Sequence, residues 1–161
     1  MALQKGIDYL IIRKLMSASI SCSIYALFLG FFGPYSDSYS SLNDFLVNLD
    51  SYLGSIPVFL MYSLPIFLIY GTITSLISDY IARLISKLTS NKVFVVFSGI
   101  LHLLFGFYFT WVGLLAAFLY FITDLVLKKK GLYDLKKLRF SLMIPVVMFI
   151  SAMVLSHLFS Y

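Results

Sequence analysis

The candidate functional residues of this sequence are ionisable side chains that lie in or beside long apolar stretches. There are four of them: Asp79, His102, Asp124 and His157. A charged group in lipid is costly, so such a residue within a membrane span is by default a functional candidate. The sequence therefore offers a polar intramembrane site of His102 with Asp79 or Asp124, able to pass protons or bind a cation.

Ion pairing is the structural alternative for the two aspartates. Each is followed four residues later by a basic residue, Arg83 and Lys128 respectively, in the order that favours a pair on a helix surface. We therefore expect the pairs Asp79–Arg83 and Asp124–Lys128 near the inner membrane surface. His102, as a neutral imidazole, needs only a serine or a backbone carbonyl as its partner.

Other kinds of site have no support in the sequence. No cluster of His, Cys and carboxylates has the spacing of metal ligands, and no nucleophile motif or phosphate-binding glycine loop is present. We expect no catalytic residues, no cofactor and no enzyme activity. The net charge of +5 comes from short basic clusters beside apolar segments, which sets orientation in a membrane and does not predict nucleic-acid binding.

The elements that would position these side chains are membrane helices. Of the 161 residues, 61% are hydrophobic and 12% charged, whereas a soluble domain carries about 25% charged residues. Backbone groups in lipid must be bonded within their own segment, so the apolar runs are predicted to be α-helical. We expect an all-α integral membrane bundle, one domain of residues 1–161, with spans at about 13–33, 57–79, 93–108, 111–127 and 140–159.

The number of spans depends on residues 93–127, in which Asp124 is the only charge. As one long tilted helix, this stretch would leave four hydrophobic segments and divide the basic residues between the two sides. As a hairpin turning near Gly106–Thr110, it would give five segments and keep all twelve Lys and Arg on one side, as the positive-inside rule favours. The hairpin would also place Trp111 at an interface, where tryptophan is enriched.

The same rule predicts the orientation in a cell membrane. It places the amino terminus in the cytoplasm and the carboxy terminus outside. The linker after the first span carries Asp37, Asp44 and Asp50, and apolar residues spaced three and four apart predict an interfacial helix at about 41–53. The basic inner loops, above all 128–139, are expected to contact anionic lipid headgroups.

Several short motifs lie between residues 60 and 130: Pro65, Tyr70-Gly71, Ser75, Ser78-Asp79, His102, and Phe121 with Asp124 ahead of a basic run. In these motifs the chain resembles a family of small uncharacterised multi-pass membrane proteins from bacteria. The resemblance implies helical spans and a bacterial plasma membrane. It implies no reaction or ligand, because none is assigned to the family.

Two functions follow as hypotheses. The first is a small non-enzymatic membrane protein that works through self-association, or as an accessory to a membrane partner. Its contact surface would be a face of small residues that lets helices approach closely, such as Ser17, Ser19, Ser21 and Ser23. The alternative is a transporter or channel subunit, which requires His102 and an aspartate to face each other or water. A factor protecting its host membrane from a toxin is a third class compatible with the sequence.

Overall fold

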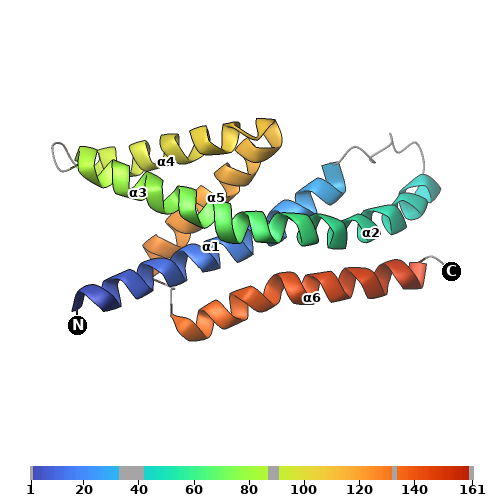
Figure 1. Ribbon diagram of the computed structural model, residues 1–161. Coiled ribbons are helices and arrows are strands. Elements are labelled where there is room, and N and C mark those ends of the chain that lie inside the picture. Colours follow the sequence, from blue (N-terminus) through green and yellow to red (C-terminus); the bar gives the residue numbers. More distant parts are fainter. Residues whose placement is uncertain (1, 33–41, 87–90, 132–133, 160–161) are drawn as a thin grey trace.

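The computed structural model describes residues 2–32, 42–86, 91–131 and 134–159, and every regular element in these ranges is helical (Figure 1). The elements in chain order are α1 (Ala2–Phe32), α2 (Leu42–Ile66), the π-helical turn η1 (Phe67–Gly71), α3 (Thr72–Ser86), α4 (Asn91–Phe107), α5 (Thr110–Lys130) and α6 (Leu135–Phe159). This confirms the predicted all-α bundle. Asp37 of the acidic linker lies outside the described residues.

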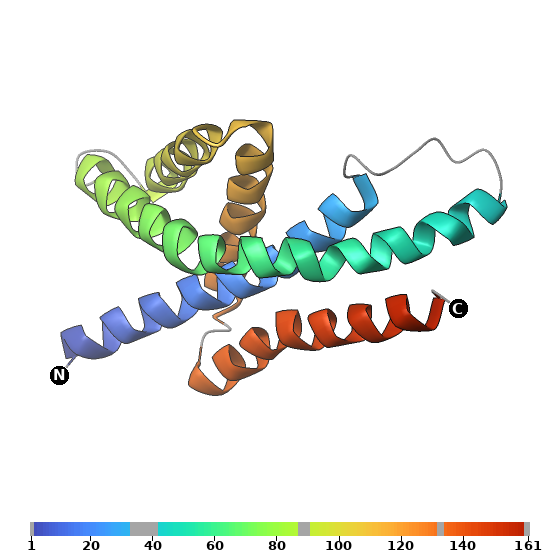
Figure 2. The same cartoon turned by 45° about the vertical axis from the view of Figure 1, so that its right-hand side comes forward.

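The segments α2, η1 and α3 form one continuous helical rod (Figures 1 and 2). The predicted interfacial helix at 41–53 is not a separate element, because residues 42–53 are the first turns of α2, which continues through Pro57. The π-helical turn begins two residues after Pro65. Proline lacks the N–H that closes the usual helical hydrogen bond, and a widened turn is one way for the backbone to accommodate that loss.

The helices α4 and α5 form the predicted hairpin. The chain turns at Tyr108 and Phe109, where the Phe109 N–H donates to the carbonyl of Gly106 at 3.0 Å. The two helices then pack against each other along their length. Residues 93–127 are therefore two helices and not one long tilted helix. At the tip, the side chain of Trp111 is largely exposed.

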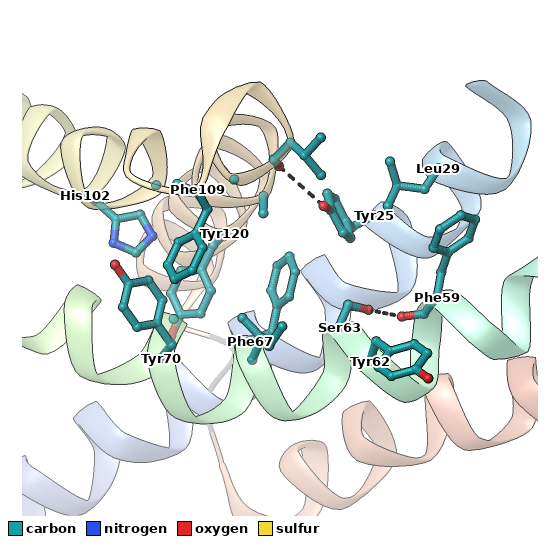
Figure 3. Close-up of a pocket in the computed structure, with 17 residues that line it drawn as sticks. Tyr25, Leu29, Phe59, Tyr62, Ser63, Phe67, Tyr70, His102, Phe109 and Tyr120 are labelled. Carbon is teal, nitrogen blue, oxygen red and sulfur yellow. Dashed lines mark hydrogen bonds between the residues drawn. The ribbon is translucent and has the colours of Figure 1, made fainter. Parts of the chain in front are cut away.

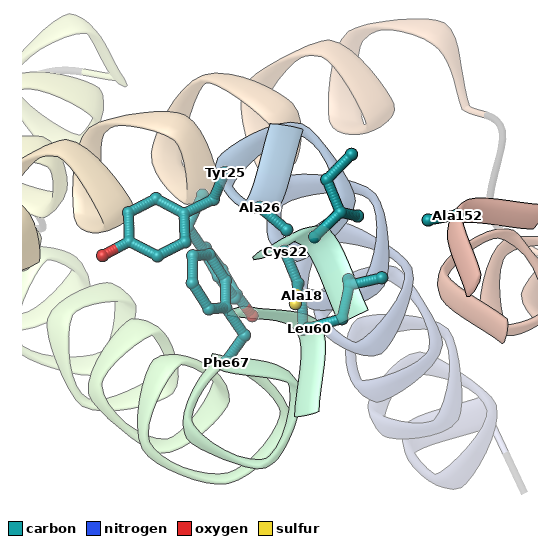
Figure 4. Close-up of a cluster of buried hydrophobic side chains, with 9 residues drawn as sticks. Ala18, Cys22, Tyr25, Ala26, Leu60, Phe67 and Ala152 are labelled. Atoms are coloured by element: carbon teal, nitrogen blue, oxygen red, sulfur yellow. The ribbon is translucent and has the colours of Figure 1, made fainter. Parts of the chain in front are cut away.

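Helix α1 is central to the bundle and packs against α2, α5 and α6, while α4 packs against α3 and α5 (Figures 1 and 2). Small side chains on α1, among them Ala18, Cys22 and Ala26, lie in the apolar core shown in Figure 4. The serine face of α1 is also buried, and Ser19 donates to the carbonyl of Ser141 on α6 at 2.6 Å. The face predicted to bind another molecule therefore holds this chain's own helices together.

Four helical stretches of the described chain are long and apolar enough to cross a membrane: Asp8–Gly30, Ser51–Ile85, Thr110–Lys130 and Leu135–Leu158. A fifth apolar helix, Val93–Phe107, is shorter. Many large apolar side chains are exposed on the surface of the bundle. This arrangement is expected when lipid and not water surrounds the helices. These features identify a membrane protein.

Candidate functional site

Four charged side chains gather inside the bundle, and we call them the buried ion cluster: Arg13 and Lys14 of α1, Asp79 of α3, and Asp124 of α5. None of them is more than 8% exposed. The small serine face of α1 allows the neighbouring helices to come close enough for these groups to meet. Two cations and two carboxylates sum to zero charge, which reduces the cost of removing them from water.

Lys14 connects the two carboxylates. Its Nζ lies 2.7 Å from Oδ2 of Asp79 and 2.8 Å from Oδ2 of Asp124. It also donates to Oγ of Ser75 at 2.7 Å. An ammonium group has three donors, so each of them finds an acceptor. Because the side chain is almost completely buried, water cannot replace any of these partners.

Arg13 and Ser98 complete the cluster. The Nε and Nη2 atoms of Arg13 donate to the two carboxylate oxygens of Asp124 at 2.8 and 3.3 Å, and Nη2 also lies 3.5 Å from Oδ2 of Asp79. Ser98 of α4 donates to Oδ1 of Asp79 at 2.6 Å. Through Ser98, the buried ion cluster is also bonded to α4, so it holds together α1, α3 and both limbs of the hairpin.

The ion pairs differ from those predicted within single helices. The sequence paired Asp79 with Arg83 and Asp124 with Lys128, but both carboxylates bind the two cations of α1. The Nζ of Lys128 instead lies 4.6 Å from the centre of the Phe94 ring. A pair on a helix surface contributes about 0.2–0.5 kcal/mol. A buried carboxylate left without a cation costs several times more, so the inward pairing prevails.

Arg13 and Lys14 were not predicted as site residues, because basic residues at the start of a first span usually only set its orientation. One signal was present in the sequence. The apolar residues Tyr9 to Ile12 precede them, which places both charges within an apolar helix and not ahead of it. Two aspartates in apolar segments also need cations in the same surroundings, and Arg13 and Lys14 lie within such a segment.

A cavity of about 420 Å³ lies between α1, the α2–η1 segment and the α4–α5 hairpin (Figure 3). Its wall is almost entirely apolar and contains no Asp, Glu, Lys or Arg. Aromatic rings make up much of it: Tyr25, Phe59, Phe67, Tyr70, Phe109 and Tyr120. Its volume lies within the range of small-molecule sites, about 300–1,000 Å³.

His102 belongs to the wall of this cavity and is 3% exposed. Within the described part of the chain, neither of its ring nitrogens has a hydrogen-bond partner. The nearby Tyr70, whose hydroxyl end points toward the imidazole in Figure 3, donates instead to the carbonyl of Phe105 at 3.1 Å. A buried polar group without a hydrogen-bond partner lowers stability. Of the predicted site residues, His102 is the one whose buried polar atoms lack such a partner among the described residues.

Tyr120 separates the cavity from the buried ion cluster. Its ring lies 5.1 Å from the His102 ring, while its hydroxyl donates to the backbone carbonyl of Lys14 at 2.9 Å. Among the hydrogen bonds of the described residues, none joins His102 to Asp79 or Asp124. The predicted polar site is therefore divided in two, with the aspartates in the cluster and His102 in the cavity wall.

The side chains that commonly bind metals are few and scattered in the described residues. In the described ranges, no three His, Cys, Asp or Glu side chains gather as metal ligands would. Arg13 and Lys14 already occupy the carboxylates of the cluster, and opposite charges at this distance leave no excess negative charge for a cation.

Fold and site together define a class: an all-α membrane protein whose bundle contains a charge-balanced ion cluster and, beside it, a cavity walled by aromatic rings. Comparison with protein families, curated proteins and solved structures gives no match. The function is therefore inferred from the geometry alone.

Proposed function

We propose that this chain is a non-enzymatic, multi-pass membrane protein that binds a small lipid-soluble molecule in its cavity, as a carrier or as an accessory to a larger membrane partner. The cavity is the observation that carries the proposal. A concave, mostly apolar space with a few polar groups is the usual form of a small-molecule site. A ring-walled space of about 420 Å³ therefore suits an occupant, and the absence of charged wall residues favours a neutral one.

The hypothesis of a proton or cation path has less support. Both carboxylates are neutralised by α1, and no hydrogen bond of the described residues leads from them to His102. Self-association also remains a proposal, but the serine face of α1 is buried within the chain. A second copy or a membrane partner would have to use another surface.

We also propose that the chain crosses a cell membrane five times, with the amino terminus in the cytoplasm and the carboxy terminus outside. The amino-terminal end of α1, the end of α3, the start of α4 and the start of α6 lie toward one end of the bundle, while the end of α6 lies toward the other (Figures 1 and 2). The exposed Lys128, Lys129 and Lys130 end α5, where they would meet anionic headgroups. A bacterial plasma membrane, implied by the resemblance, stays a prediction.

The limb α4 is the shortest of the five proposed crossings. Its 17 residues extend over about 26 Å, a few ångströms less than the average hydrocarbon core. Local thinning of the bilayer accommodates such a mismatch at modest cost.

Cysteine labelling in intact cells tests this topology. In a Cys22→Ala background, Tyr161→Cys is expected to react with a membrane-impermeant maleimide, and Lys130→Cys is expected to react only after the membrane is permeabilised. The reason is that the positive-inside rule keeps the lysine cluster in the cytoplasm. Labelling of Lys130→Cys in intact cells would contradict the hairpin topology.

Equilibrium binding of radiolabelled naphthalene tests the proposed function. The protein is placed in lipid nanodiscs, and partitioning into empty nanodiscs is subtracted. We expect saturable binding to the wild-type chain. Ala116→Phe, which fills part of the cavity, is expected to weaken binding by about tenfold or more, because a ring at this position occupies the ligand's space.

The matched control is Val147→Phe, which adds a ring to an exposed position on α6 that is not part of the cavity wall. It is expected to bind like the wild type. Thermal unfolding shows whether Ala116→Phe is folded, and if it is not, Val112→Phe at the half-exposed rim replaces it. Binding without a saturable component, or equal binding by a folded cavity-filling variant, would overturn the proposed function.

A further inference from the structure

The unsatisfied imidazole of His102 indicates what the cavity holds. A neutral imidazole carries one donor and one acceptor. Neither has a partner among the described residues, although only 3% of the residue is exposed. Both nitrogens are covered in the present orientation of the ring. A half-turn about the Cβ–Cγ bond exchanges nitrogen and carbon positions, and this turn would bring the nitrogens to the places that ring carbons now hold. A polar atom on an occupant would supply the missing partner.

The aromatic residues of the cavity wall indicate the shape of the apolar part of the ligand. The ring of Phe67 comes from the π-helical turn, and Phe109 comes from the hairpin tip. With Tyr70 and Tyr120, they present aromatic faces and edges to one space (Figure 3). Aromatic rings pack favourably against other rings in stacked or edge-on arrangements. A flat ring compound therefore fits this wall better than a flexible chain.

The rim of the cavity shows where the occupant enters. Three wall residues are half or more exposed: Tyr62 at 70%, Ile66 at 54% and Phe109 at 50%. They belong to the apolar outer faces of α2 and of the hairpin tip, which lipid covers in the proposed topology. Entry from the bilayer selects molecules that dissolve in lipid, so the occupant is neutral.

From these observations we propose that the ligand is a neutral, lipid-soluble ring compound with a hydroxyl or carbonyl group, of the phenol or quinone type, and that His102 binds this group by a hydrogen bond. The proposal rests on the proposed function and names the ligand class for the same cavity. The buried ion cluster does not contact the ligand; it fixes the helices from which the wall is built.

A matched pair of probes separates the hydrogen bond from the apolar contacts. Naphthalene and 1-naphthol share one ring system, and only 1-naphthol has a hydroxyl group. In lipid nanodiscs, after correction for partitioning, the wild-type protein is expected to bind 1-naphthol about tenfold more tightly, since a buried hydrogen bond of ordinary strength has about this effect. His102→Phe is expected to remove that preference, so that the variant binds both probes with equal affinity.

A second readout reports on His102 without a substitution at that position. Ring ¹⁵N resonances of the two histidines are recorded in ¹⁵N-histidine-labelled protein, with His157→Gln as the variant that assigns them. Addition of 1-naphthol is expected to shift a nitrogen resonance of His102 strongly, because a hydrogen bond forms at that nitrogen, whereas naphthalene is expected to shift it far less. A purely structural histidine would show no difference between the two probes.

The outcomes distinguish this inference from the proposed function. Saturable naphthalene binding together with equal affinity for 1-naphthol, and unmoved His102 resonances, would overturn the inference and leave the binding function intact. If neither probe binds saturably, the proposed function fails and the inference fails with it. A preference for 1-naphthol that is lost in His102→Phe, with the resonance shift, supports both.

Discussion

Replacing Asp124 with asparagine is expected to lower the free energy of unfolding by about 3–5 kcal/mol, the range for removing one partner of a buried ion pair. Its carboxylate binds both Arg13 and Lys14. The amide keeps the shape of the side chain but not its charge, so the two cations would then share Asp79 alone. Unfolding in detergent micelles with increasing dodecyl sulfate, followed by circular dichroism, measures the change.

Two further variants show whether the effect comes from unbalanced charge. Asp134→Asn makes the same chemical change at an exposed position before α6, where asparagine caps a helix equally well. It is expected to change stability by less than about 0.5 kcal/mol. Lys14→Met combined with Asp124→Asn restores a balance of one cation and one carboxylate, and it should recover at least half of the loss. If Asp124→Asn proved as stable as Asp134→Asn, the cluster would not be what joins α1 to α5.

The hairpin could be predicted because its signals are local or depend only on composition. Lysines at both ends of residues 93–127 and aromatic residues in the middle each indicate a side or a depth in the membrane. Those preferences do not require knowledge of which helices are neighbours. The structure places the turn at Tyr108 and Phe109, within the predicted Gly106–Thr110.

The buried ion cluster could not be predicted in the same way, because its bonds cross the bundle. Asp124 and Arg13 are 111 positions apart in the chain, and Lys14 and Ser75 are 61 apart. A spacing of four along one helix is visible in a sequence, and it predicts the pairs Asp79–Arg83 and Asp124–Lys128. The stronger partners lie on other helices, and only the packing of α1 against α5 brings them together.

The cavity lies where the short α4–α5 hairpin ends beside the longer helix α1. The sequence predicts the hairpin but not this cavity. Helix α1 has 31 residues and α4 has 17, so the hairpin covers only part of α1. The hairpin tip contributes Phe109 and Val112 to the wall, and Tyr25 of α1 reaches the carbonyl of Val112 at 3.4 Å. The buried ion cluster fixes the hairpin, and the cavity occupies the space beside its tip. Of the wall residues, the sequence marked His102 as an ionisable group within an apolar stretch.

Because the hairpin tip forms part of the cavity wall, the crossing of α4 and α5 is expected to be sensitive to small changes. A Cβ atom on Gly106 would lie 2.7 Å from the carbonyl oxygen of Gly113, and closer still to the Cβ of Ala117. Backbone cannot yield to such a contact, so Gly106→Ala should force the two helices apart. We expect a loss of about 1–3 kcal/mol, as for other overpacked interiors. This exceeds the gain of roughly 0.5–1 kcal/mol that alanine normally brings to a helix.

The control for Gly106→Ala is Gly54→Ala in α2, where the nearest atom to an added Cβ is Oγ of Ser156 at an ordinary 3.4 Å. That variant is expected to keep the helical gain and to become more stable by up to about 1 kcal/mol. The same chemical change thus has opposite signs at the two positions. Naphthalene binding should weaken in Gly106→Ala alone, because Gly106 and Gly113 both line the cavity. Equal stabilisation by both substitutions would mean that α4 and α5 do not approach this closely where they line the cavity.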